Sequence, residues 1–160
     1  MPHTMSPSVT DVAARKQRDR RDALRQFAFV ADGLMPHEDV VNVQAYPQAI
    51  LTEEQRIIVN SDATAILELL RKGVYSATQV FTATVTAAIC ANDLTNCLTE
   101  SCLEDAFERA KELDQYLKQT GQVVGPLHGL PVSIKDHIKI KGLDTSTGYV
   151  GKVQYPFGTQ

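Results

Sequence analysis

The chain has 160 residues, of which 43% are hydrophobic and 22% charged, and its net charge at pH 7 is −3. This composition is typical of a globular domain and excludes a disordered chain, a collagen-like repeat and a disulfide-dense scaffold. The near balance of 16 basic and 19 acidic residues argues against a dedicated nucleic-acid-binding protein. No apolar run approaches the roughly 20 residues that span a bilayer, so we expect no membrane partner.

The first predicted element is a helix over residues 12–31, which contains much of the positive charge. Its apolar residues, at helical spacing, are Leu24, Phe27, Ala28 and Ala31. Six of the 16 basic residues fall between Arg15 and Arg25. A solvated helix face with alternating charges accounts for them, and contact with phosphates or a membrane surface is the alternative. Residues 36–51 contain two prolines and are predicted to form an extended connector.

Residues 52–118 are predicted to form four helices separated by short breaks. The first begins with a capping box, in which the hydroxyl of Thr52 and the side chain of Gln55 satisfy backbone donors at the helix start. A stop signal at Gly73 separates the second helix from the third. Ser76 is placed to cap the third helix, whose apolar face is wide and composed mostly of small residues.

The amino-acid composition of the chain changes after residue 120. Residues 121–160 hold seven of the nine glycines. The segment from Leu130 to Lys135 is the best strand candidate, and residues 142–160 are predicted to be a loop.

Cysteine and histidine residues offer little sign of a metal or nucleophile site. Cys90, Cys97 and Cys102 lack the spacing of a zinc or redox motif, so we expect reduced thiols in a cytoplasmic protein. A Cys–His nucleophile pair would need His128 or His137 beside a cysteine, and His128 is expected instead to stabilise the Gly-Pro turn by a hydrogen bond. Cys97, Cys102, His128 and His137 also lack a recognised metal-ligand spacing. We therefore expect no metal and no cofactor.

The most informative stretch is residues 125–136, GPLHGLPVSIKD. Its glycines and prolines fix a rigid approach to a short strand, which ends at Lys135. If the lysine is buried there, its pKa falls and the neutral amine becomes a competent general base. From the residues alone, the preferred interpretation is a lysine that meets Asp136 or water at the strand end.

The same stretch resembles the lysine motif of the amidase signature family. Residues 69–77 are similar to the early helix pair of that family, residues 96–114 to its fungal acetamidase branch, and residues 141–149 to the segment after the lysine strand. The resemblance covers roughly residues 52–149. It implies an α/β protein with the amidase-signature fold, a mixed sheet covered by helices, of which this chain is the N-terminal, mostly helical part, truncated after the first strand or strands. It also implies a division into residues 1–51, a tail with a basic helix and connector, and residues 52–160, a partial amidase domain.

The resemblance further implies hydrolysis of small-molecule carboxylic acid amides by a Ser–Ser–Lys triad without a metal. Lys135 matches the lysine of that triad. In the family both serines follow in a Gly- and Ser-rich stretch, and residues 136–160 contain nothing similar. We therefore expect an N-terminal fragment that is inactive by itself. The alternative is a non-catalytic binding or interaction protein derived from an amidase, and the oligomeric state stays open in both cases.

Overall fold

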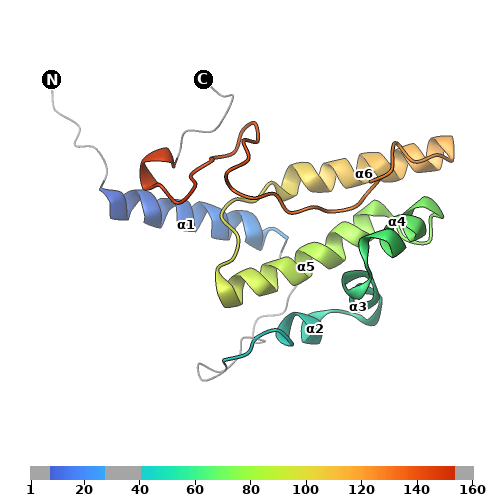
Figure 1. Cartoon of the computed structure of the whole chain (residues 1–160), viewed down its shortest axis with the longest axis horizontal. Coiled ribbons are helices and arrows are strands. Elements are labelled where there is room, and N and C mark those ends of the chain that lie inside the picture. Colours follow the sequence, from blue (N-terminus) through green and yellow to red (C-terminus); the bar gives the residue numbers. More distant parts are fainter. Residues whose placement is uncertain (1–7, 28–40, 154–160) are drawn as a thin grey trace. The chain divides into compact units, whose positions relative to one another are not determined.

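The computed structural model describes residues 8–27 and 41–153 (Figure 1). They fall into two compact units. The helical unit consists of Phe27–Leu98 and Leu103–Val132, and the terminal unit of Met1–Gln26, Thr99–Cys102 and Ser133–Gln160. The boundary at residues 132 and 133 therefore lies inside the 125–136 motif, and each unit is taken in turn.

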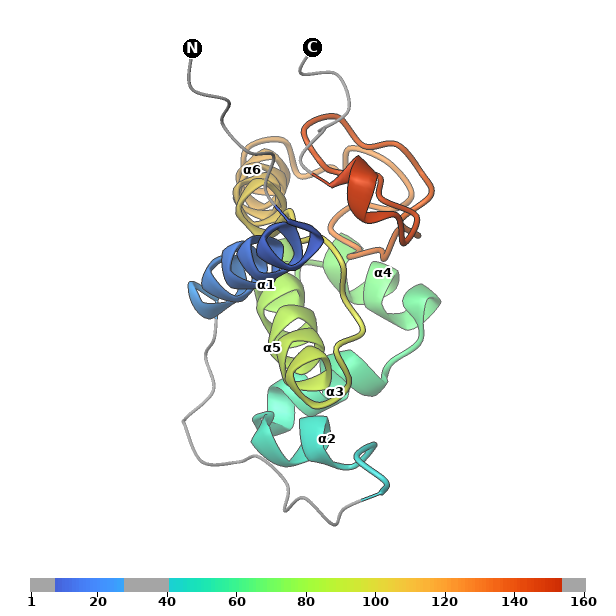
Figure 2. The ribbon, with the colours of Figure 1, turned by 90° about the vertical axis from the view of Figure 1, so that its left-hand side faces the viewer.

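The helical unit is organised around one long helix, α5 (Ala77–Thr95). This helix contacts α2 (Tyr46–Ile50), α3 (Glu53–Asn60) and α6 (Leu103–Thr120), and α4 (Ala63–Arg71) precedes it in the chain (Figures 1 and 2). The wide face predicted for α5 is buried on several sides, which is why α5 supplies much of the core. The buried apolar residues of this unit are Leu51, Ile58, Ile66, Leu70, Ala77, Val80, Phe81, Ala83, Val85, Ile89, Ala110 and Leu113.

Helix starts in this unit follow the capping signals in the sequence. The Thr52 hydroxyl accepts a hydrogen bond from the backbone N–H of Gln55 at 3.2 Å, and the Gln55 side chain accepts one from the Thr52 N–H at 3.0 Å. Ser76 and Gln79 form the same capping box at the start of α5, and Asp62 caps α4. The predicted caps are therefore confirmed, because each depends only on neighbouring residues.

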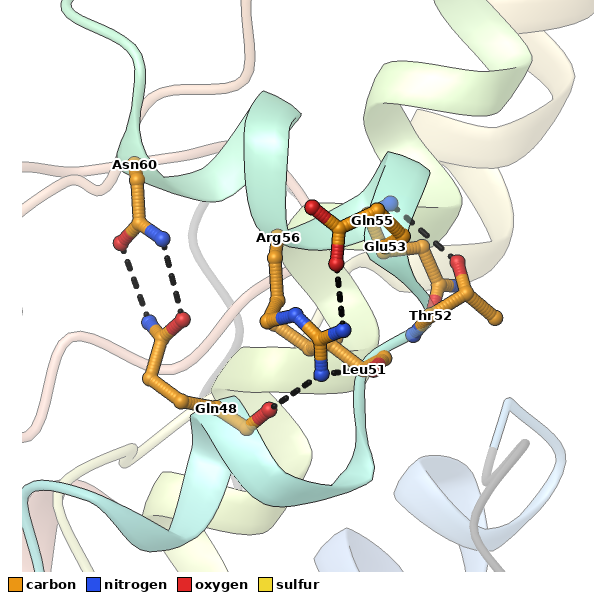
Figure 3. Close-up of polar contacts among 7 residues, drawn as sticks. All are labelled: Gln48, Leu51, Thr52, Glu53, Gln55, Arg56 and Asn60. Atoms are coloured by element: carbon orange, nitrogen blue, oxygen red, sulfur yellow. Dashed lines mark hydrogen bonds and ion pairs between the residues drawn. The ribbon is translucent and has the colours of Figure 1, made fainter.

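A polar cluster joins α2 to α3, as Figure 3 shows. The Arg56 guanidinium donates to the carbonyl oxygens of Gln48 at 3.4 Å and Leu51 at 3.1 Å, and it pairs with Glu53. These carbonyls lie at the end of α2, where no helical N–H reaches them. The side-chain amides of Gln48 and Asn60 also exchange two hydrogen bonds, of 3.1 and 3.0 Å. A short helix that could not persist alone is thereby fixed to α3.

Asp114 on α6 caps the N-terminus of α5. Its carboxylate accepts hydrogen bonds from the backbone N–H groups of Ala77, at 2.5 Å, and Thr78, at 3.1 Å, and from the Thr78 hydroxyl. A carboxylate at this position also complements the positive end of the helix dipole. This one side chain therefore holds together two helices whose contacting residues are 36 to 37 positions apart in sequence.

Three aromatic rings extend the helical unit on one side. Phe27, Phe81 and Phe107 lie with ring centroids 5.3 to 6.0 Å apart, and the two pairs that include Phe27 are edge-to-face. Lys111 lies over the Phe107 ring at 4.2 Å. Such arrangements add a small attraction to the area that the rings bury.

The terminal unit has less regular structure. Its helix α1 (Val9–Arg25) begins with a capping box between Ser8 and Asp11 and contacts a single 3-10 turn, η1 (Val150–Lys152) (Figure 1). In the terminal unit, Leu24 is the buried apolar residue among those the structure describes. The Lys16 ammonium reaches out from α1 to Asp144 at 2.8 Å and to Glu100 at 2.7 Å. Polar contacts therefore contribute more to this unit than an apolar core does.

Three predictions about elements need correction. The first helix ends at Arg25, and its predicted last residues, 28–31, lie outside the described residues. The predicted connector contains α2, because Pro47 lies in the first turn of that helix, where its missing N–H costs nothing; residues 36–40 lie outside the described part. The segment 130–135 has no regular secondary structure, and the described residues contain no strand at all. A strand requires a paired neighbour, and no described segment pairs with this one.

Candidate active-site segment around Lys135

The first half of the 125–136 motif is a tight turn in the helical unit. The His128 N–H donates to the Gly125 carbonyl at 3.2 Å, and the Leu130 N–H to the Leu127 carbonyl at 3.2 Å. Gly129 has a φ of +74°, and a Cβ at this residue would lie 2.9 Å from the Cβ of Ala77 and 3.2 Å from Leu70. Only glycine fits there, since both the backbone conformation and the close approach to α4 and α5 exclude a side chain.

His128 fixes the same turn from inside. It is 4% exposed, and its Nδ1 accepts a hydrogen bond from the Val124 N–H at 3.3 Å, so the imidazole is neutral with its proton on Nε2. Burial lowers the pKa of His128, and Arg109 contributes in the same direction, whereas Asp114 opposes the shift. The interpretation of His128 as a residue that stabilises the turn agrees with this geometry.

An apolar pocket of about 260 Å³ lies beside this turn, also within the helical unit. Leu130 and Pro131 line it together with aliphatic side chains of α3, α4 and α5, and Ser61 and Thr84 add hydroxyl groups. Such a pocket can accept an apolar group, but its lining residues include no acidic or basic side chain that could activate the two hydroxyls.

Lys135 lies in the part of the motif that belongs to the terminal unit, which begins at Ser133. Its side chain is exposed, and within the described part of the chain its ammonium has no hydrogen-bond or ion-pair partner. Its carbonyl accepts from the Ile138 N–H at 2.9 Å, which closes a turn directly after it. The structure therefore does not bury this lysine or pair it with Asp136. It leaves the side chain exposed to water, which is one of the two alternatives in the interpretation from the residues alone.

Asp136 turns away from the lysine toward the following loop. One of its oxygens, Oδ2, accepts from the Ser146 hydroxyl at 3.0 Å and from the Thr147 N–H at 2.8 Å. Thr147 has a φ of +50° and Gly148 a φ of +82°, so the loop curls tightly at this point. The segment with Lys135 is thus tied to the loop 144–148.

That loop is tied in turn to α1. Asp144 is 6% exposed and pairs with Lys16, which also pairs with Glu100. Burial opposes protonation of Lys16, but the two carboxylates outweigh it and raise the pKa of Lys16. Burial raises the pKa of Glu100, with Lys16 acting against the shift and the charges of Asp144 and Asp136 adding to it. Sequence reasoning missed this cluster, because its members lie far apart in the chain and carry no spacing signal.

The other candidate residues form no site. Cys90, Cys97 and Cys102 are free thiols, and burial raises the pKa of Cys90, with the charge of Asp93 adding to the shift. His137 is exposed. Among the residues that the structure describes, no three His, Cys, Asp or Glu side chains gather where they could hold a metal ion. Within the same residues, no helix combines the length and apolar character required to cross a bilayer.

Comparison with known proteins identifies the family to which the 125–136 motif belongs. Residues 79–158, half of the chain, match the model of the family described as Amidase. The chain belongs to the amidase family. It is 38% identical over 146 residues to an acetamidase of Aspergillus oryzae, which covers 91% of this chain, and 44% identical over 103 residues to amidase 1 of Gibberella moniliformis, which covers 64%.

A solved structure shows the same fold. Fatty acid amide hydrolase superposes on 92% of this chain with a TM-score of 0.78 and 30% sequence identity. The helices described above are therefore part of an amidase-signature fold, as the motif predicted. The chain spans about a quarter of the length of the relatives that it matches: 26% of the Aspergillus acetamidase, 20% of amidase 1 and 27% of fatty acid amide hydrolase.

Proposed function

We propose that this chain supplies the lysine-bearing part of an amidase that hydrolyses carboxylic acid amides to the acid and ammonia or an amine. The observation that carries the proposal is Lys135, which ends the 125–135 segment inside the region that matches the family. Its exposed ammonium, which has no partner among the residues that the structure describes, supports the proposal, because such a side chain is available to groups from another segment of an amidase.

In this proposal Lys135 acts as the general base in its neutral form. It takes a proton from a bridging serine, which takes one from the nucleophilic serine as that serine attacks the amide carbonyl. The carbon–nitrogen bond then breaks as the proton held by Lys135 passes back through the bridging serine to the leaving amine. Water, deprotonated by the same serine and lysine, then attacks the acyl-enzyme, which releases the acid and restores the nucleophilic serine. The reaction uses no metal or cofactor, and residues 136–160 contain no segment that resembles the serine-bearing stretch.

Two further statements belong to the proposal. The 160 residues by themselves do not hydrolyse amides, because the two serine partners of Lys135 are not among them. The protein works in a reducing compartment such as the cytoplasm, which suits the free thiols of Cys90, Cys97 and Cys102. The division into residues 1–51 and a partial amidase domain, 52–160, is also proposed.

The first test is to incubate the purified 160-residue chain with acetamide and with aromatic amides. We expect no release of ammonia or amine above a blank. Turnover that disappears in the Lys135→Ala variant would contradict the claim that the serines lie elsewhere.

The second test supplies the serines. Residues 52–153 of this chain replace the matching segment of the Aspergillus oryzae acetamidase, and the chimera is assayed for acetamide hydrolysis. We expect activity that depends on Lys135. A chimera that folds and binds amides yet loses nothing on Lys135→Ala would remove this lysine from the mechanism.

A second candidate function, as a non-catalytic interaction protein, is favoured by three exposed apolar side chains near Lys135. Val132, Ile134 and Ile138 are 66%, 51% and 52% exposed. If the chain is part of an amidase, further parts of the enzyme would cover these side chains. The isolated 160-residue chain should then self-associate through them. A monodisperse monomer in sedimentation velocity would favour the interaction protein instead.

A further inference from the structure

We propose that Asp136 is a positioning residue for Lys135: its carboxylate fastens the lysine segment to the loop 144–148, which the Lys16–Asp144 ion pair anchors. The inference rests on the proposed function only in so far as Lys135 is the base. The fastening itself is a property of the described residues, and it can be measured without any catalysis.

The first support is the convergence of donors on one carboxylate oxygen. The Ser146 hydroxyl, at 3.0 Å, and the Thr147 backbone N–H, at 2.8 Å, both point at Oδ2 of Asp136. Hydrogen bonds to a charged acceptor are roughly twice as strong as those between neutral groups. Because Asp136 follows Lys135 directly, fixing its side chain also fixes the backbone of the lysine.

The second support is the backbone conformation that the carboxylate holds. Thr147 has a φ of +50°, which is unfavourable for a β-branched residue and is normally left to glycine. Its N–H reaches Asp136 in this conformation, and its hydroxyl donates to the Ser146 carbonyl at 2.7 Å. A strained residue persists only where its surroundings determine it, so the loop is shaped around the carboxylate.

The third support is the effect on the charge of the lysine. An ion pair between neighbouring Asp136 and Lys135 would favour the ammonium form, whereas a general base must be neutral. Here the carboxylate is engaged by the loop, and the ammonium has no partner among the described residues. Asp136 therefore positions the lysine without binding its charge.

The loop 144–148 is itself attached to α1 by an ion pair. Asp144 is almost fully buried, and Lys16 on α1 donates to it at 2.8 Å while pairing with Glu100 at 2.7 Å. Asp144 is followed closely by Ser146 and Thr147, with at most two residues between them. The loop therefore has little freedom between its attachment to Lys16 and its attachment to Asp136. The chain of contacts thus runs from α1 through the loop to Lys135.

The test compares Asp136→Ala with Asp136→Asn, using Asp19→Ala as a control for loss of an exposed acid. The Asn side chain retains an oxygen that accepts from both donors, whereas Ala retains none. Amide hydrogen exchange of Ile138 and Thr147 in the 160-residue chain reports the fastening directly. We expect exchange about tenfold faster in Asp136→Ala, a smaller increase in Asp136→Asn, whose neutral oxygen accepts more weakly, and exchange close to the parent in Asp19→Ala.

The same variants are placed in the acetamidase chimera, where kcat, KM and the pH profile are measured. We expect Asp136→Ala to lower kcat about 10-fold to 100-fold with little change in KM, since misplacement of a reacting group costs rate. Asp136→Asn should restore kcat and keep the parent pH profile. Equal losses in both variants, with a shared shift of the pH profile, would show that the charge matters and would overturn the positioning role.

Two controls keep the outcome interpretable. If Asp136→Ala fails to fold, Ser146→Ala, which removes one donor, should give an intermediate loss of exchange protection, whereas Thr147→Gly, which keeps the N–H, should give none. Unchanged exchange in Ser146→Ala and Asp136→Ala would overturn the proposal. If Lys135→Ala leaves the chimera active, the proposed function fails while the exchange result still decides the role of Asp136.

Discussion

The helical unit and the terminal unit are held together in different ways. In the helical unit twelve apolar side chains are buried and the starts of α3, α4 and α5 are capped by their own neighbours. In the terminal unit, by contrast, the main links among the described residues are the ion pairs of Lys16 and the hydrogen bonds of Asp136. The comparison teaches that the candidate catalytic lysine belongs to the unit with fewer buried apolar side chains among its described residues, where a few polar side chains determine its position.

Gly129→Ala should have the largest effect, and it should fall on the helical unit. The new Cβ would lie 2.9 Å from the Cβ of Ala77 in a residue whose φ is +74°. Overpacking and the left-handed conformation together should cost about 3 kcal/mol of unfolding free energy. Chemical denaturation measures it, and Gly125→Ala, where a Cβ meets nothing within 4 Å, is the matched control. A loss below that of the control would show that the turn does not pack against α4 and α5 as described.

Asp114→Ala should come next, since it removes the cap of α5 and leaves the N–H groups of Ala77 and Thr78 without their acceptor. We expect a loss of about 2 kcal/mol in denaturant unfolding. Glu112→Ala on the same helix breaks an exposed pair with Arg109 and should change the free energy of unfolding by under about 0.5 kcal/mol. Similar losses in the two variants would contradict the assignment of Asp114 as the link between α5 and α6.

Lys16→Met tests the terminal unit by itself. Loss of the ammonium leaves the buried carboxylate of Asp144 without this partner, so local opening of residues 133–153 should become easier by about 1–2 kcal/mol. Hydrogen exchange measures this change. The exchange of α5 amides should stay as in the parent. Equal changes in both segments would mean that the two units unfold as one.

His128 should give the smallest effect, visible as a pH dependence. Burial lowers its pKa in the folded chain below the usual 6.5, so the unfolded chain binds the proton more readily. Stability contributed by neutral His128 is therefore full above pH 6.5 and decreases as the pH falls below it. Unfolding free energies between pH 5 and 8 should show this slope, and His128→Gln should flatten it. A slope that persists in the variant would have to come from another group.

Local sequence patterns predict more of the helical unit than of the terminal unit. Thr52, Ser76 and Gly73 act on residues next to them, so their roles as caps and stops could be predicted from local pattern. The α2 helix was missed because Pro47 was interpreted as an interruption, although a proline in a first turn supports a helix.

The candidate site was only half predictable. Lys135 and the turn at Gly129 could be found from a continuous motif, but the partners of Asp136, Asp144 and Lys16 lie 10 to 128 residues away from them. No periodicity connects such positions. The predicted strand 130–135 depended on a pairing segment, and the described residues do not include one.

The measurement that tests the central claim most directly compares Lys135→Ala with Lys141→Ala in the acetamidase chimera. Both lysines are exposed and both variants lose one positive charge, so they differ only in position. We predict that Lys135→Ala lowers kcat for acetamide about 100-fold or more, as loss of a general base does, while Lys141→Ala stays near the parent. Equal activity of the two variants would contradict the assignment of Lys135 as the catalytic base.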